Sequence, residues 1–452
     1  MGLRDLYIAL IYAGFFVVGI TTPFVLVLGY LWVDTFYPQA LSFWIAQIPA
    51  SMIIAVAAMV GYVLLDRRSP RFAFHTALTL LFAAWVTLTL TWAERPDSGW
   101  VKWDWAFKVV TFASFLPLVL RSRVQIEAFL QVFLFSAMVH MIAVGSKTLL
   151  SGSGYGRQLD VIGGNSGITE SSYLAAVSVS VIPIILYLRT HSILVPKSKI
   201  QSIGYLALVP IAIFSAMGTY ARTALAGFLV VGFFMWLQSR RKLLYTLCAS
   251  VVVLAVVART ADSWNERIAT TTDWQQDTTN GRILVWEWTL KYALQNPFGG
   301  GFQAYEINQI VYPAENGQAP HVEYGRAFHN MYMEVLGEQG FPGLAMFLTL
   351  LFTSLWYMWS VARRTRGKPH LAWAHDLAQT LLTSLLTMMA CACFIGIAFQ
   401  ALVWYLITLP VCLNGYLLRV EQLEGGSERA LPWVRPPVRA ALPPPAAARV
   451  AR

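Results

Sequence analysis

The sequence contains few charged residues. Only 12% of its 452 residues are Asp, Glu, Lys or Arg, whereas 57% are hydrophobic and 14% are aromatic. Soluble domains carry charge at about a quarter of their positions, so this composition excludes a water-soluble globule. The repeated apolar runs of about 20 residues are long enough to cross a membrane as helices, and longer than barrel strands. The composition therefore predicts an all-α, polytopic membrane protein.

The sequence also lacks the motifs of several enzyme classes. Its four cysteines lie in apolar runs without CxxC spacing, so they indicate neither a disulfide framework nor a zinc site. It has no DxD pair to hold a divalent ion against a diphosphate, and no GxSxG, HExxH or P-loop motif. We therefore expect no metal and no other cofactor. The first apolar run lacks a small-residue cleavage site and is predicted to remain as an anchor.

Twelve membrane-spanning helices are predicted from the apolar runs. The first run is long and contains Pro23, so it is expected to kink or to divide into two helices. The predicted spans lie at 6–33, 42–65, 72–92, 103–120, 124–147, 169–188, 201–217, 222–237, 243–258, 343–361, 376–395 and 398–419.

Lys and Arg are concentrated in alternate connections between these spans, which marks the cytoplasmic side of a membrane. About two thirds of the 33 Lys and Arg residues lie in these connections and the two termini. Both termini are therefore predicted to be cytoplasmic. The same bias accounts for much of the net charge of +10 without a nucleic-acid partner.

The predicted topology divides the chain into four regions. One outer connection is much longer than the others, and a loop of such length usually carries function. The regions are spans one to nine at 1–258, the large outer loop at 259–342, spans ten to twelve at 343–419, and a basic, Pro- and Ala-rich tail at 420–452.

The large loop is expected to contain short helices. In the first, TTNGRILVWEWTLKYALQNP, Asn280 is the candidate N-cap and the helix ends before Pro297. Its many apolar residues suggest a helix that lies on the bilayer surface. Arg282 falls in the first turn, where a cation opposes the helix dipole. It is a candidate anion ligand, and the alternative is an arginine that reaches to lipid headgroups.

The second loop helix lies in FHNMYMEVLGEQG. Asn330 is its candidate N-cap, and Gly340 and Pro342 are expected to end it. His329 then stands just outside a positive helix end, which disfavours protonation and keeps the imidazole in the neutral form that a general base needs. A structural role is the alternative for a single histidine.

Glu334 and Glu338 lie one turn apart in this second helix. We expect them to orient neighbouring groups or to face solvent, and not to act as an acid and base pair.

Arg222, in GTYARTALAG, is predicted at the outer end of a span, against the general charge bias. Burying an arginine partly in a membrane costs free energy, so its presence suggests a functional role. The alternative is a side chain that reaches to the lipid headgroups. Arg222, Arg282 and His329 all map to the same side of the membrane. Two guanidinium groups can hold a diphosphate through paired, charge-assisted hydrogen bonds. The pattern predicts transfer from a lipid diphosphate.

Three motifs carry a resemblance to a known superfamily. The superfamily comprises O-antigen ligases (WaaL), O-antigen polymerases (Wzy) and bacterial O-linked oligosaccharyltransferases, and the sequence resembles the ligases in particular. The motifs are TYARTALAG at 219–227, NGRILVWEWTL with NPFGGGF at 280–302, and FHNMYMEVLGEQGFPGLAMF at 328–347.

The resemblance implies a GT-C-like glycosyltransferase of the bacterial inner membrane with its active site facing the periplasm. Arg222 and Arg282 would bind the diphosphate of an undecaprenyl diphosphate donor, and His329 would act on the acceptor hydroxyl. The supporting residues would be Tyr220, Asn330, Tyr332 and Glu334. The sequence departs from the usual Ser-x-Ser-Arg pattern at Thr219, Tyr220, Ala221 and Arg222, so one accessory hydroxyl is missing.

The single dominant outer loop favours a ligase, which joins O-antigen to the lipid A-core. Membrane lipids would be its other partners. The second choice is a polymerase, which shares the same motifs, and the third is an O-linked oligosaccharyltransferase. A polytopic lipid or glycan transporter is the rival from another class; it would place ionisable residues near mid-membrane and show repeat symmetry. A scaffold protein of the envelope would tolerate changes at all three predicted site residues.

Overall fold

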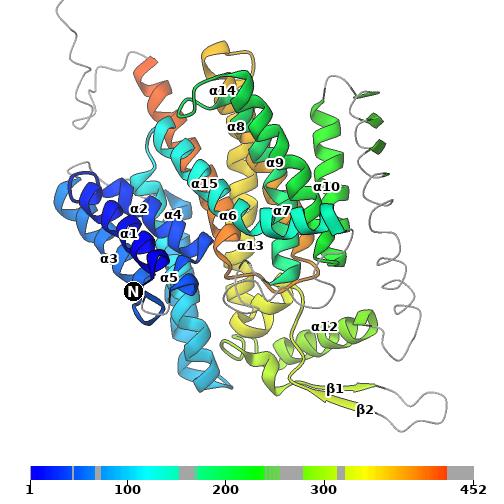
Figure 1. The fold of residues 1–452 in the computed structure, drawn as a ribbon. Coiled ribbons are helices and arrows are strands. Elements are labelled where there is room, and N and C mark those ends of the chain that lie inside the picture. The colour runs from blue at the N-terminus through cyan, green and yellow to red at the C-terminus, as the bar shows by residue number, and fades with distance from the viewer. Residues whose placement is uncertain are drawn as a thin grey trace, which may run out of the picture.

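The computed structural model describes residues 2–42, 45–66, 73–151, 168, 170–239, 278–312 and 321–424, and isolated positions between 242 and 254. These residues form a bundle of helices with one helix lying across its lower end and a small hairpin beside it (Figure 1).

Most of the described residues are helical. The helices are α1 (Leu3–Thr21), α2 (Pro23–Phe36), α3 (Ala50–Leu65), α4 (Phe74–Leu88), α5 (Pro96–Val119), α6 (Arg123–Ser151), α7 (Ser171–Ser180), α8 (Ile182–His191), α9 (Lys199–Gly218), α10 (Arg222–Gln238), α12 (Thr278–Gln295), α13 (Met331–Thr365), α14 (Ala372–Cys391) and α15 (Ala401–Glu424). Short 3-10 turns are η1 (Pro38–Leu41), η2 (Ile45–Gln47), η3 (Thr89–Trp92), η6 (Ala304–Ile307) and η7 (Pro369–Leu371).

Two strands, β1 (Gln309–Tyr312) and β2 (His321–Tyr324), pair antiparallel, with Gln309 opposite Tyr324. The sequence predicted only helices in the large loop, so this hairpin was missed.

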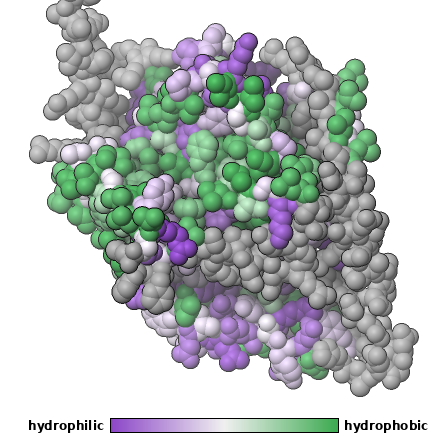
Figure 2. Space-filling view, in the orientation of Figure 1, coloured by the Kyte–Doolittle hydropathy of each residue, from purple (hydrophilic) through white to green (hydrophobic). Residues whose placement is uncertain are grey.

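Seven helical stretches among the described residues are long and apolar enough to cross a membrane, and three shorter apolar helices, α2, α3 and α10, accompany them. Figure 2 shows an apolar band across the middle of the molecule between more hydrophilic ends. An integral membrane protein is therefore supported. The predicted total of twelve spans is not confirmed. The predicted ninth span, 243–258, falls largely outside the described residues.

Several predicted boundaries need correction. The first apolar run does divide, because α1 ends at Thr21 and Pro23 occupies the first position of α2, where its missing N–H costs nothing. The helix in the predicted span 42–65 starts later than expected, because α3 begins only at Ala50. In the large loop, α12 begins at Thr278, so Asn280 lies inside the first turn and is not the N-cap.

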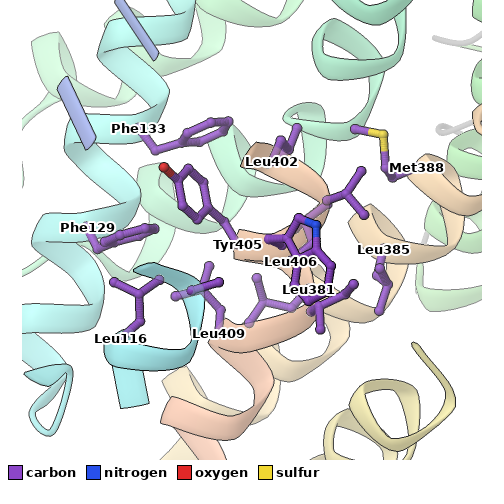
Figure 3. Close-up of a cluster of buried hydrophobic side chains, with 14 of the residues drawn as sticks. Leu116, Phe129, Phe133, Leu381, Leu385, Met388, Leu402, Tyr405, Leu406 and Leu409 are labelled. Atoms are coloured by element: carbon purple, nitrogen blue, oxygen red, sulfur yellow. The ribbon is translucent and has the colours of Figure 1, made fainter. Parts of the chain in front are cut away.

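The core of the bundle is centred on α15. Trp404 and Tyr405 are among its largest fully buried side chains. The ring of Tyr405 packs edge-on against Phe129 of α6, with ring centres 5.2 Å apart, and its hydroxyl donates to Asp34 of α2 at 2.8 Å. Leu385 of α14 lies on another side of α15 in the same cluster (Figure 3). Helix α15 therefore joins the two halves of the chain.

Helix α13 breaks at Gly340, the residue predicted to end the second loop helix. Gly340 has φ 66° and ψ −170°, which interrupts the helix. The carbonyls freed there are taken up by NPFGGGF: the amide of Gly300 donates to Gly337 at 3.0 Å, and that of Gly301 donates to Glu338 at 2.9 Å. A Cβ on Gly340 would lie 2.3 Å from the carbonyl oxygen of Pro297. Two of the sequence motifs thus pack directly on each other.

We expect Gly340→Ala to destabilise the protein by roughly 2–5 kcal/mol, because it combines a left-handed backbone with overpacking. The measurement is the thermal unfolding midpoint of the purified protein in detergent. Gly232→Ala in α10 is the matched control, since a Cβ there meets nothing within 4 Å. Equal midpoints for the two variants would show that the close contact at Gly340 is unimportant.

Candidate functional site

Helix α12 lies across the end of the bundle, next to the first turns of α13 (Figure 1). Its buried side carries Val285, which packs with Ile310 of the hairpin and with Phe328 just before α13. Trp286 donates from its indole nitrogen to the carbonyl of Phe328 at 2.9 Å. These contacts fix the backbone immediately before His329 against α12.

The exposed side of α12 carries Ile283, Leu290 and Leu294, which are 53%, 47% and 67% exposed. An apolar face of this kind fits the predicted position on a bilayer surface, which stays a prediction.

Asn330 is the N-cap of α13, as predicted. Its side-chain oxygen accepts hydrogen bonds from the amides of Tyr332 at 2.9 Å and Met333 at 3.1 Å. The Tyr332 hydroxyl donates to the carbonyl of Met389 in α14 at 3.2 Å. His329 precedes this cap with a left-handed backbone, φ 47°. The cap and the tyrosine therefore hold the histidine in place.

The imidazole of His329 is biased toward its neutral form, as predicted, but for different reasons. His329 is exposed as a whole residue, yet loss of water around the ring is the main cause that lowers its pKa from 6.5 to about 4. The positive charges of Arg282 and Arg326 are the further causes. Above about pH 4 the ring can accept a proton.

The structure brings Arg222 and Arg282 within range of each other's charge. Arg222 is the first residue of α10 and is exposed, and it follows Tyr220, which is buried and has a left-handed backbone, φ 52°. Burial first, and then the charges of Arg222 and Arg326, lower the pKa of the Arg282 guanidinium. The charge of Arg282 thus acts on His329, and the charge of Arg222 acts on Arg282. The meeting of all three groups in one cavity stays a prediction.

Arg326 is a third cation at this site, and the sequence analysis missed it. Its guanidinium lies over the first turns of α12, where a Cβ on Gly281 would come within 2.3 Å of it. It bonds to Tyr312 and Glu323 of the hairpin. Its backbone is clamped by Asn308, whose side chain accepts from the Arg326 amide at 2.9 Å and donates to its carbonyl at 2.6 Å. The only hint in the sequence was its place three residues before His329.

The charges of Arg282 and Arg326 act on the imidazole of His329, and the charge of Arg222 acts on Arg282. Such a set of cations favours a multiply charged anion, because like charges are costly to assemble without one. Glu323 contacts Arg326 and offsets part of this charge. The arrangement suits a diphosphate held by the arginines, with a proton acceptor next to it.

Glu334 and Glu338 point into the protein. This fits the expectation that they orient neighbouring groups, and the alternative expectation that they face solvent is wrong. Both pair with Lys102 of α5, at 2.6 Å and 2.8 Å. Glu334 also accepts from the amide of Ala398 at 3.0 Å, and Glu338 from that of Gln303 at 3.0 Å. The three charged side chains are at most 9% exposed. Lys102, which the sequence analysis missed, therefore ties α5 to the helix that follows His329.

Further contacts join the N-terminal half to the glycine-rich segment after α12. Trp92 donates from its indole nitrogen to Gly299 at 3.1 Å, and the amide of Glu94 donates to Gly300 at 2.8 Å. The carboxylate of Glu94 also accepts from the Tyr292 hydroxyl at 2.9 Å. The N-terminal half thus braces the segment that supports the break in α13.

No group of three or more His, Cys, Asp or Glu side chains that could hold a metal ion occurs in the part of the chain that the structure describes. The cysteines Cys391, Cys393 and Cys412 are free. The fourth, Cys248, lies outside the described residues.

The apolar helices and the site at their end define an integral membrane protein. Two family models match its chain. Residues 206–348 match the O-antigen ligase family, and residues 3–193 match a family of unknown function, DUF5935. No curated protein matches the sequence. The first match contains all three arginines of the site and His329, and it supports the superfamily of O-antigen ligases and polymerases and a glycan-transferring enzyme within it.

We expect the ring of His329 to titrate near pH 4 and not near the ordinary 6.5. Chemical modification by diethyl pyrocarbonate requires the neutral ring, so its rate at His329, followed by peptide mass spectrometry, should stay high down to about pH 5. Arg326→Gln removes one positive charge and should move the midpoint upward. A midpoint near 6.5 in the unaltered protein would contradict this environment.

We expect Lys102→Met to destabilise the protein by about 3–5 kcal/mol, because it leaves two buried carboxylates without their cation. Glu338→Gln leaves one carboxylate per ammonium and should cost much less. Lys108→Met is the control on the same helix. In the described part of the chain Lys108 pairs with the exposed Asp104 alone, at 2.6 Å, and this pair should contribute less than about 1 kcal/mol. Thermal midpoints that do not separate Lys102→Met from Lys108→Met would rule out a stabilising triad.

Proposed function

We propose that the protein is an O-antigen ligase, which transfers O-antigen polysaccharide from undecaprenyl diphosphate to the lipid A-core at the periplasmic face of the bacterial inner membrane. The observation that carries the proposal is that the charges of Arg282 and Arg326 act on a neutral His329, and that the charge of Arg222 acts in turn on Arg282. All four residues lie within 206–348, the part of the chain that matches the O-antigen ligase family.

In the proposed reaction His329 takes the proton of an acceptor sugar hydroxyl as that oxygen attacks the anomeric carbon of the donor glycan. The bond between this carbon and the phosphate oxygen breaks, and its electron pair leaves with the diphosphate. Arg222, Arg282 and Arg326 stabilise the charge that develops there. His329 then returns its proton to the diphosphate or to solvent. The step uses no metal, because the arginines take the part that a divalent ion plays elsewhere.

The residues around His329 support the step without touching the reacting atoms. Asn330 and Tyr332 hold the start of α13, and Glu334 ties it to Lys102 and Ala398. Tyr220 places Arg222 at the start of α10 through its left-handed backbone. Such positioning supplies much of the rate in transfer reactions.

An O-antigen polymerase is the second candidate, since it would use the same residues on a different acceptor, and an O-linked oligosaccharyltransferase is the third. The deciding experiment supplies the purified protein with lipid-linked O-antigen and with lipopolysaccharide that ends at its core. Capped core supports the ligase, and a longer lipid-linked polymer supports the polymerase. Movement of intact lipid-linked glycan across a vesicle membrane without transfer would indicate a transporter.

We expect His329→Asn to reduce transfer by about 100- to 10,000-fold, which is the usual contribution of a general base. Arg222→Lys and Arg282→Lys keep the charge but lose the two-pronged geometry, and each should reduce transfer strongly. The measurement is capped core formed per minute by equal amounts of purified protein.

Lys291→Gln is the matched control for Arg282, because Lys291 lies on the same helix, has a side chain that is 70% exposed, and pairs among the described residues with Glu287 alone. Its transfer rate should equal that of the unaltered protein. Full activity in His329→Asn would remove the proposed base, and full activity in both lysine variants would reduce the arginines to simple point charges.

A further inference from the structure

A second charged site lies at the other end of the bundle from His329. A cavity of about 850 Å³ opens between the end of α10, the end of α13, η7 and the start of α14, near the top of Figure 1. The 35 residues of α13 separate this cavity from the candidate active site. It therefore belongs to neither the diphosphate site nor the proposed reaction.

Positive charge dominates the lining of this cavity. Its cations are Arg363, Arg366 and Lys368. The one carboxylate among the described lining residues, Asp376, is already engaged, because the ring nitrogen of His191 lies 2.6 Å from it. No ion pair joins Arg363, Arg366 or Lys368 to an acid among the described residues, whereas the neighbouring Arg364 pairs with Glu421 at 2.9 Å.

An exposed aromatic stripe on α13 leads to these cations. Phe352, Trp356 and Trp359 follow one another on the same side of the helix and are 59%, 61% and 44% exposed. The rings of Trp356 and Trp359 lie 4.9 Å apart, and the guanidinium of Arg363, one turn later, lies 4.5 Å above the ring of Trp359. Tryptophan marks the level of lipid headgroups in membrane helices.

The opposite wall of the cavity repeats this order of apolar and polar groups. It is formed by α10, where Leu237 is 47% exposed and precedes the polar Gln238. Apolar surface thus runs up to the cavity and stops where the cations begin. A free phosphate would need only the cations, whereas a lipid would use both surfaces.

We propose that this cavity binds the headgroup phosphate of an anionic phospholipid whose acyl chains lie along the exposed aromatic side of α13. The lining cations neutralise the phosphate and the net negative charge of the lipid. A zwitterionic lipid carries its own cation and gains less from the site. The connection that carries Arg366 and Lys368 is also among those predicted to face the cytoplasm, so the ligand would belong to the cytoplasmic leaflet.

The test measures binding of phosphatidylglycerol and phosphatidylcholine to the full-length protein in detergent by native mass spectrometry. Arg366→Gln/Lys368→Gln removes two cations at exposed or half-exposed positions and should weaken binding of phosphatidylglycerol by about 10- to 30-fold. Lys197→Gln/Lys199→Gln removes two exposed cations outside the cavity and is the matched control. It should bind like the unaltered protein.

Two outcomes would overturn the proposal. One is equal binding of phosphatidylglycerol to the Arg366/Lys368 variant and to the control. The other is equal binding of the two lipids to the unaltered protein. Displacement of phosphatidylglycerol by millimolar inorganic phosphate would show that the cavity takes a water-soluble anion, and this would also remove the lipid as its ligand.

Discussion

The close backbone contact between the glycines after α12 and the break in α13 is the constraint on which the site depends. Gly299 and Gly340 both have left-handed backbones, and a Cβ on either would overlap the other segment. This contact sets the end of α12 against α13, and the beginning of the same helix carries Arg282, whose charge acts on His329.

The N-terminal half of the chain contributes to this arrangement without supplying a reacting group. Lys102 pairs with two carboxylates of the helix that follows His329, and Glu94 binds both the backbone of Gly300 and the hydroxyl of Tyr292. These contacts cross from residues 3–193, the match to a family of unknown function, to residues 206–348. They give that N-terminal region a physical task, which is to keep the end of the bundle rigid.

The sequence was informative where local rules decide the structure. Apolar runs predicted most helices, and the polar side chain of Asn330 before an amphipathic stretch predicted its cap. The site residues that the sequence did not predict are placed by contacts between distant segments. Lys102 meets Glu334 across 232 residues, and no periodicity records such a pairing. Arg326 gains its place from a two-stranded hairpin whose strands are too short to leave a clear alternating pattern.

The left-handed backbone at His329 limits the substitutions that this position can accommodate. Asparagine, aspartate and glycine adopt this conformation at little cost, whereas valine, isoleucine and threonine clash with their own backbone. A β-branched replacement would therefore disturb the cap formed by Asn330 as well as remove the ring. The backbone conformation therefore restricts the residues that this position tolerates, independently of the chemistry that its side chain performs.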